Sequence, residues 1–164
     1  MTNVTPPIIM GSLCYVFHEG RVLLLKRLHP PHQGLWTAPG GKVEFGESLH
    51  DCCIREVYEE TGIQITMPDL RAIQTVVDVA IPIQWQLFIF RTTLMEKITP
   101  QNQPEHNEGE LRWIGVDDLS TLDRPYTDMQ YWDHVRGKST SLWRGKFVYD
   151  TPHKLVSEQI YPTE

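Results

Sequence analysis

The chain has 164 residues, of which 40% are hydrophobic and 22% charged, and its formal net charge at pH 7 is −6. This length predicts one domain, residues 1–164, because two domains of ordinary size would not fit. The acidic balance argues against a nucleic acid polymer as partner, since binding a long polyanion requires a surplus of lysine and arginine. A small phosphate ester can still bind where metal ions supply positive charge.

Neither a membrane span nor a secretion signal is predicted. No apolar run approaches 18 residues, and the N-terminal stretch MTNVTPPIIM lacks a basic region. Cys14, Cys52 and Cys53 show neither a disulfide framework nor zinc-ligand spacing, so we expect small buried hydrophobic side chains. These features predict a cytoplasmic protein without membrane contact.

The first part of the chain is predicted to form two strands. Residues 8–17 are apolar and β-branched. The stretch RVLLLKR at 21–27 has a continuous apolar centre, which indicates burial on both faces of a sheet. At its end, Lys26 is expected to be solvated, whereas Arg27 points to the opposite side and is a candidate phosphate contact.

Residues 35–63, LWTAPGGKVEFGESLHDCCIREVYEETGI, combine two adjacent glycines with five glutamates. Ser48, followed three residues later by Asp51, is a capping-box signature, and Gly62 lies where a helix ends in a left-handed residue. These signals predict a helix over residues 49–61.

Two acids of this helix share one face. Glu56 and Glu60 lie one turn apart on the stripe that also holds Leu49 and Cys53, so both are expected to face the body of the protein. At ~5 Å and an effective dielectric constant of ~20, their mutual repulsion is about 3 kcal/mol. A hard divalent cation with oxygen ligands, Mg²⁺ or Mn²⁺, relieves that repulsion. The helix is therefore a predicted metal site.

The same residues have a plainer interpretation. The helix face would be solvated, with Arg55 and Glu59 as an ordinary surface pair, and Gly40 and Gly41 would form a simple tight turn. Next to an acidic helix, however, adjacent glycines indicate a loop whose bare backbone approaches a metal and phosphates closely. We favour this second interpretation.

Three further strands are predicted downstream, over residues 71–80, 84–91 and 111–115. Residues 96–110 form a polar loop before the last of them. The end of this loop holds three acids, Glu105, Glu108 and Glu110. Either one of these acids completes the metal site, or the loop is simply solvated.

The C-terminal part is predicted to contain a short helix at 117–122, a longer helix at 126–136 and a closing hairpin of strands 143–149 and 155–161. The longer helix carries aromatic residues, which suits packing against a sheet.

The glycine and acid spacing of residues 35–63 resembles the signature of the Nudix hydrolases. In order, its residues here are Gly41, Glu47, Arg55, Glu56, Val57, Glu59, Glu60, Gly62 and Ile63. Members of that family cleave nucleoside diphosphates linked to another group and fold as an α/β/α sandwich with a mixed sheet. The resemblance implies this α/β fold and a magnesium-dependent diphosphate hydrolase. Within the family, RVLLLKR, LRWIGV and TDMQYW look most like the MutT-type enzymes, which hydrolyse 8-oxo-dGTP to the monophosphate and pyrophosphate.

The resemblance also implies roles for individual residues. The expected metal ligands are Glu56, Glu59 and Glu60, with the backbone carbonyl of Gly40 and the loop acid Glu108. Arg55 would orient the acids and Glu47 would brace Arg55, and we expect Glu56 to act as the general base. The expected substrate-binding residues are Arg27, Thr37, Gly41, Lys42, Tyr126, Asp128 and Trp132.

The expected substrate is a nucleoside triphosphate with an oxidised or otherwise modified purine. Trp36, Tyr126 and Trp132 offer flat surfaces for stacking a base, and Asp128 can accept hydrogen bonds from it. Both tryptophans can also be explained as core residues, and for Trp132 that explanation is at least as good. Alternative functions are an ADP-ribose or nucleotide-sugar pyrophosphatase and a nucleotide-binding module without activity. The protein is expected to be a monomer or a homodimer.

Overall fold

The structure is a computed structural model that describes residues 5–101, 107–151 and 154–162. Its strands within these ranges form one sheet of order β3-β2-β1-β6-β5-β8-β9, with β4 alongside β1 and β7 alongside β2. The bounds are β1 Ile8–His18, β2 Arg21–Arg27, β3 Trp36–Thr37, β4 Gly40–Lys42, β5 Asp69–Asp78, β6 Ile83–Thr93, β7 Gly109–Gly115, β8 Trp143–Thr151 and β9 Lys154–Tyr161. The sheet is mixed, because β1 runs parallel to β6 and β5 to β8, while the remaining pairs are antiparallel.

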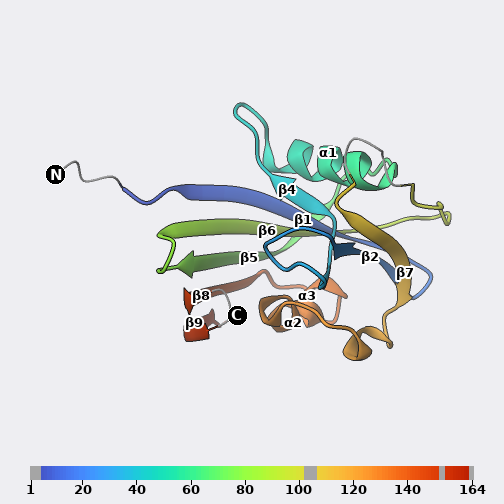
Figure 1. The fold of residues 1–164 in the computed structure, drawn as a ribbon. Helices are drawn as coiled ribbons and strands as arrows, with labels where there is room; N and C mark the ends of the chain where they lie inside the picture. The colour runs from blue at the N-terminus through green and yellow to red at the C-terminus, as the bar shows by residue number, and fades with distance from the viewer. Residues whose placement is uncertain (1–4, 102–106, 152–153, 163–164) are drawn as a thin grey trace.

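Helices cover both faces of this sheet (Figure 1). The helix α1, Leu49–Thr61, lies on one side, and α2, Tyr126–Gln130, and α3, Trp132–Val135, lie on the other. A 3-10 turn, η2 Leu119–Thr121, precedes α2. The predicted α/β/α sandwich with a mixed sheet is confirmed.

Each face of the sheet has its own hydrophobic cluster. On the α1 side, Cys14, Leu23 and Phe90 pack with Cys53 and Val57 of the helix. On the opposite side, a larger cluster joins the sheet to the helices of the C-terminal half and includes Tyr15, Leu24, Ile89, Tyr131, Trp143 and Phe147. Strand β2 contributes to both clusters, which confirms the predicted burial on two faces. All three cysteines are free and buried, as expected.

Helix α1 has the predicted bounds, and both of its predicted ends are confirmed. The Ser48 hydroxyl accepts a hydrogen bond from the Asp51 N–H at 3.1 Å and donates to the Asp51 carboxylate at 2.7 Å. Gly62 closes the helix in the left-handed conformation, with φ of 70°, and its N–H donates to the Tyr58 carbonyl. The helix is therefore fixed at both ends by its own sequence.

Several predicted boundaries need correction. The helix expected at 126–136 is broken at Tyr131, whose φ and ψ of −99° and 4° leave the helical region. Tyr131 is fully buried and packs edge-on against Trp143, so tertiary packing overrides the helical pattern there. The helix expected at 117–122 is only η2, and the strands expected at 71–80 and 84–91 are displaced by two residues at one or both ends.

The two short strands β3 and β4, in the glycine-containing stretch before α1, were not predicted. The loop acid Glu105 lies outside the described residues. No helix of the described residues is long and apolar enough to cross a membrane.

Candidate active site

The candidate site lies where α1 packs against β4. Glu60 is only 5% exposed, and its Oε2 accepts a hydrogen bond of 3.0 Å from the Gly40 N–H. Gly41 faces the carboxylate of Glu56, because a Cβ added at Gly41 would overlap that carboxylate. The two adjacent glycines thus let the backbone of β4 approach two acids of α1 more closely than any other residue type allows.

Arg55 ties the acids of this region together. Its Nε and Nη2 bind the two carboxylate oxygens of Glu47 at 2.7 and 3.0 Å. Its Nη1 binds Glu56 at 2.8 Å and Glu59 at 3.0 Å, and its Nη2 also donates to the Lys42 carbonyl at 3.1 Å. The pair between Arg55 and Glu59 is therefore one part of a network that reaches β4, and not an isolated surface pair.

This arrangement perturbs the ionisation of several acids. Hydrogen bonds from Arg55 lower the pKa of Glu47 to about 2. Burial raises the pKa of Glu56, against the opposing effect of Arg55. Burial also raises the pKa of Glu60 to about 8, and the nearby charges of Glu56 and Glu108 add to that rise. Several negatively charged carboxylates thus lie close to Glu60, which is itself largely shielded from water. Such an arrangement is typical of a functional site.

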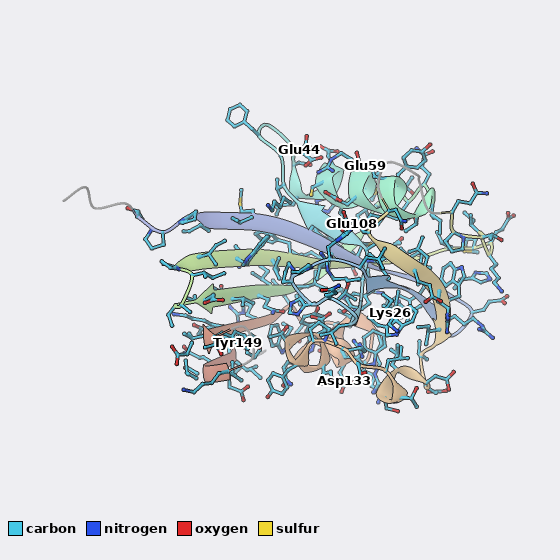
Figure 2. The ribbon with its side chains drawn as sticks, in the orientation of Figure 1. Lys26, Glu44, Glu59, Glu108, Asp133 and Tyr149 are labelled. Carbon is cyan, nitrogen blue, oxygen red and sulfur yellow. The ribbon has the colours of Figure 1, made fainter. Side chains whose placement is uncertain are left out.

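The loop before β7 brings one of the predicted acids to this site. Glu108 lies within electrostatic reach of Glu60, and its carbonyl accepts a hydrogen bond of 2.9 Å from the Leu28 N–H. Figure 2 shows Glu59 and Glu108 toward the α1 side of the molecule, with Tyr149 and Asp133 on the other side. Glu110 instead forms an exposed ion pair with Arg112.

Arg27 supplies positive charge at the same place. Its charge opposes the rise in the pKa of Glu60, and its Nε donates to the Pro31 carbonyl at 2.8 Å. A surface hollow of about 330 Å³ adjoins it, lined by Lys26, Arg27, Leu28, Gln33, Gly34 and Glu110. Lys26 is exposed, as expected, and its Nζ lies 5.9 Å from the ring centre of Trp36.

The donor set fits a hard divalent cation. Three carboxylates, those of Glu56, Glu59 and Glu60, lie on one helix, and the glycine backbone of β4 lies against two of them. In the described part of the chain, no three acid, histidine or cysteine side chains converge closely enough to hold an ion as they stand. Glu56 and Glu59 would have to turn from Arg55 toward Glu60 to bind one, and their carboxylates are at the ends of flexible side chains.

Asp128 and Tyr126, two of the residues expected at the base, lie on the opposite face of the sheet, whereas Thr37 pairs in register with Leu25 on the α1 face. Asp128 is 5% exposed and accepts a hydrogen bond of 3.1 Å from the Tyr15 hydroxyl, and burial raises its pKa. Tyr126 is 43% exposed, and its hydroxyl binds Glu158 at 2.9 Å. Thr37 is buried, and its hydroxyl has no hydrogen-bond partner among the described residues.

The two tryptophans differ in their surroundings. Trp36 is 6% exposed and belongs to the larger cluster, which confirms the core alternative for it. Trp132 is partly buried and packs against Tyr15 and Phe17, with ring centres 5.7 and 6.0 Å apart. Trp132 therefore has aromatic neighbours on β1.

Sequence reasoning missed Trp85. Trp85 of β6 is partly exposed, and the Lys42 Nζ lies 5.7 Å from its ring centre. Cross-strand register places Trp85, Val76 and Phe147 in one row on one face, and Tyr126 packs edge-on against Phe147. The stretch QWQLFIF predicted a strand. Its pattern does not show whether the tryptophan is buried in the core or lies on a part of the sheet that no helix covers completely.

Comparison with known proteins decides the family. A NUDIX domain model matches residues 9–134. The chain belongs to the Nudix family. The Nudix hydrolase YvcI of Bacillus subtilis is 36% identical over 152 residues, which are 91% of this chain and 92% of that protein. A MutT protein structure from Bacillus halodurans superposes with a TM-score of 0.79 and 33% identity, over 94% of this chain and 98% of that one.

A further match is shorter. An ADP-ribose pyrophosphatase of Methanocaldococcus jannaschii is 42% identical over 45 residues, 27% of each protein. These comparisons support a MutT-like Nudix hydrolase, and Nudix hydrolases generally use Mg²⁺ or Mn²⁺.

Proposed function

We propose that this Nudix hydrolase cleaves a purine nucleoside triphosphate to the monophosphate and pyrophosphate. The observation that carries the proposal is the contact between α1 and β4, where Glu56 and Glu60 lie against two glycines with Glu108 and Arg27 close by. A divalent cation held by Glu56, Glu59, Glu60 and the Gly40 carbonyl would supply positive charge to the diphosphate and make a bound water more acidic.

The chain's own residues have distinct tasks in this proposal. Arg55, held by Glu47, fixes the positions of Glu56 and Glu59. Glu56, whose burial raises its pKa, would accept the proton of the attacking water. Arg27, beside an open hollow, would bind the phosphates that leave.

The base would bind on the other face of the sheet. Trp85 and Tyr126 are two partly exposed aromatic side chains on that face, and the strands β6 and β8 that support them are separated only by β5. Adjacent strands lie ~4.8 Å apart, so about 10 Å separates β6 from β8. A flat ring can stack on either side chain, and Lys42 above Trp85 can reach a phosphate.

A substitution at Glu60 tests the catalytic site. Glu60→Gln keeps the size of the side chain and removes its charge, so we expect at least a hundredfold lower kcat at saturating Mg²⁺. Glu44→Gln is the matched control, because Glu44 is exposed in the loop before α1. Activity of Glu60→Gln within threefold of wild type would refute the metal assignment.

A substrate panel tests the reaction. Deoxynucleoside triphosphates, ADP-ribose, nucleotide sugars and dinucleoside polyphosphates would be compared by kcat/KM with Mg²⁺. We expect a purine triphosphate to be the best substrate. The short match to an ADP-ribose pyrophosphatase makes ADP-ribose the main competitor, and a preference for it would overturn the proposed substrate class. Binding without turnover of any compound would instead favour a non-catalytic binding module.

A further inference from the structure

Arg124 lies beside Trp132 and Asp128, two residues that the sequence predicted to bind the base, and it has no assigned role. It precedes Pro125 and α2, and its Cζ lies 5.0 Å from the ring centre of Trp132. Its positive charge counteracts the effect of burial on the pKa of Asp128, and its charge together with a side-chain hydrogen bond does so for the pKa of Tyr15, so it lies close to both. Arg124 therefore belongs to the compact group formed by these three side chains.

One edge of this guanidinium is unpaired. In the part of the chain that the structure describes, the Nε and Nη2 atoms of Arg124 are buried and have no hydrogen-bond partner. These two nitrogens carry parallel N–H groups on the same edge of the plane, the edge with which arginine binds two acceptors at once. Buried donors without partners are unfavourable, so a ligand with two neighbouring acceptors would be stabilised here.

Of the two common purine bases, guanine presents such a pair. Its O6 and N7 are adjacent acceptors, and arginine binds them with both N–H groups. Adenine pairs its N7 acceptor with an amino donor at N6, which would face an arginine N–H. An 8-oxoguanine base in its usual keto form carries a hydrogen on N7, so one of the two acceptors is lost.

We propose that the Nε and Nη2 edge of Arg124 recognises O6 and N7 of a guanine base whose N7 carries no hydrogen. The inference rests on the proposed hydrolysis of a purine nucleoside triphosphate and narrows it. It selects the unoxidised base over the oxidised one expected from the sequence. Because both nitrogens are buried, the base must displace part of the packing around Trp132 as it binds. The inference therefore places the base beside Trp132, which stacks on Phe17, and not at Trp85, whose row crosses β1 at Ile9.

The wild-type enzyme provides the first test. Its kcat/KM would be measured with Mg²⁺ on dGTP, on 7-deaza-dGTP, in which a C–H replaces N7, and on 8-oxo-dGTP. We expect dGTP to exceed both analogues by about tenfold or more, the usual loss when one bidentate base contact is broken. If kcat/KM for dGTP and for 7-deaza-dGTP lie within threefold of each other, the proposal is overturned. This test uses only the wild-type enzyme, so it does not depend on the folding of any variant.

A pair of variants then assigns the effect to Arg124. Arg124→Lys keeps the positive charge next to Trp132 but removes the planar edge. We expect it to reduce the ratio of kcat/KM between dGTP and 7-deaza-dGTP to within threefold of one. The matched control is Arg112→Lys, because Arg112 also lies over a tryptophan, 5.4 Å from the ring centre of Trp36, and is exposed on β7. The control should keep the wild-type ratio, and an unchanged ratio in Arg124→Lys would refute the role of Arg124.

The same measurements separate this inference from the function on which it rests. If the wild-type enzyme hydrolyses no deoxynucleoside triphosphate, the proposed function fails and the inference fails with it. If it hydrolyses dGTP and 7-deaza-dGTP equally well, the function stands and only the role of Arg124 is lost.

Discussion

At the scale of single residues, the contact between Arg55 and Glu47 connects the loop before α1 to the acids of the helix. The Glu47 side chain is 13% exposed and that of Arg55 is 24% exposed, so solvent screens their interaction only in part. The pair orients Arg55, and Arg55 in turn orients Glu56 and Glu59. Under the proposed mechanism, stability and activity would thus be linked at this one arginine.

The lowered pKa of Glu47 predicts a pH-dependent contribution to stability. Its pKa falls from 4.5 to about 2 on folding, so the stabilisation is complete above pH 4.5 and is lost as the pH falls toward 2. At 1.36 kcal/mol per pKa unit the upper bound is about 3 kcal/mol, and partial exposure reduces it. We expect Glu47→Gln to lower the free energy of unfolding by about 1–3 kcal/mol at pH 7 and by progressively less below pH 4.5.

Urea unfolding of wild type and Glu47→Gln at pH 7, 4.5 and 3 would measure this difference. The control is Glu44→Gln, since Glu44 is exposed in the same loop and should change stability by less than ~0.5 kcal/mol. A deficit in Glu47→Gln that stays constant from pH 7 to pH 3 would show that the charge of Glu47 is not its cause.

The two adjacent glycines should respond differently to a methyl group. At Gly40 an added Cβ would overlap the backbone carbonyl of Ser12, which cannot move without disturbing β1. At Gly41 the three nearest atoms all belong to the carboxylate at the end of the Glu56 side chain. We expect Gly40→Ala to lower the Tm strongly, and Gly41→Ala to leave the Tm within about 3 °C while reducing kcat at least tenfold.

Thermal melts and kcat at saturating Mg²⁺ would be recorded for both alanine variants. Equal losses of Tm in the two variants would contradict the distinction. Full activity of Gly41→Ala would mean that Glu56 does not need its present position against β4.

At the scale of elements, α1 is specified locally while the helices on the opposite face are not. Ser48→Ala removes the hydroxyl that caps the helix and should destabilise the protein by about 1 kcal/mol. Gly62→Ala places a side chain at φ of 70° and should cost about as much. Ser157→Ala, on the exposed strand β9, is the control.

Chemical denaturation of the three variants and of the double variant would test both ends of the helix. Ser48 and Gly62 lie at opposite ends of a 13-residue helix, so their effects should add within ~0.5 kcal/mol. A loss of less than ~0.3 kcal/mol in Ser48→Ala would show that packing alone holds the start of α1.

At the scale of the whole molecule, the metal site proposed at the acids of α1 would couple folding to metal binding. The folded chain gathers Glu56, Glu60 and Glu108, and a cation that binds only this state stabilises it. At a hundred times its Kd, Mg²⁺ would add about 2.7 kcal/mol, which for this chain length is a rise in Tm of about 5–10 °C. We expect this rise in wild type and in Glu44→Gln, and a rise of less than 2 °C in Glu60→Gln.

Differential scanning calorimetry with and without Mg²⁺ would measure these shifts. An undiminished rise in Glu60→Gln would place the cation elsewhere. The result is independent of turnover, so it tests the metal site even if the substrate is misassigned.

The sequence by itself determined the elements whose signals are local. The caps at Ser48 and Gly62 fix α1 to the residue, the apolar run of RVLLLKR fixes β2, and the spacing of Glu56 and Glu60 places two acids on the inner face of the helix. In each case the interaction that defines the element lies within one turn of helix or within one strand. Residues close together in the sequence are therefore sufficient to predict it.

Only the tertiary structure decided the features that depend on distant partners. The break at Tyr131 follows from its contact with Trp143, and the buried state of Asp128 follows from Tyr15, 113 residues away. Likewise, the open position of Trp85 and the unpaired edge of Arg124 depend on which parts of the sheet the C-terminal segments cover. The periodicity of a sequence indicates which side of a helix or strand faces the core. It does not show which residues pack against that side, because long-range packing decides those contacts.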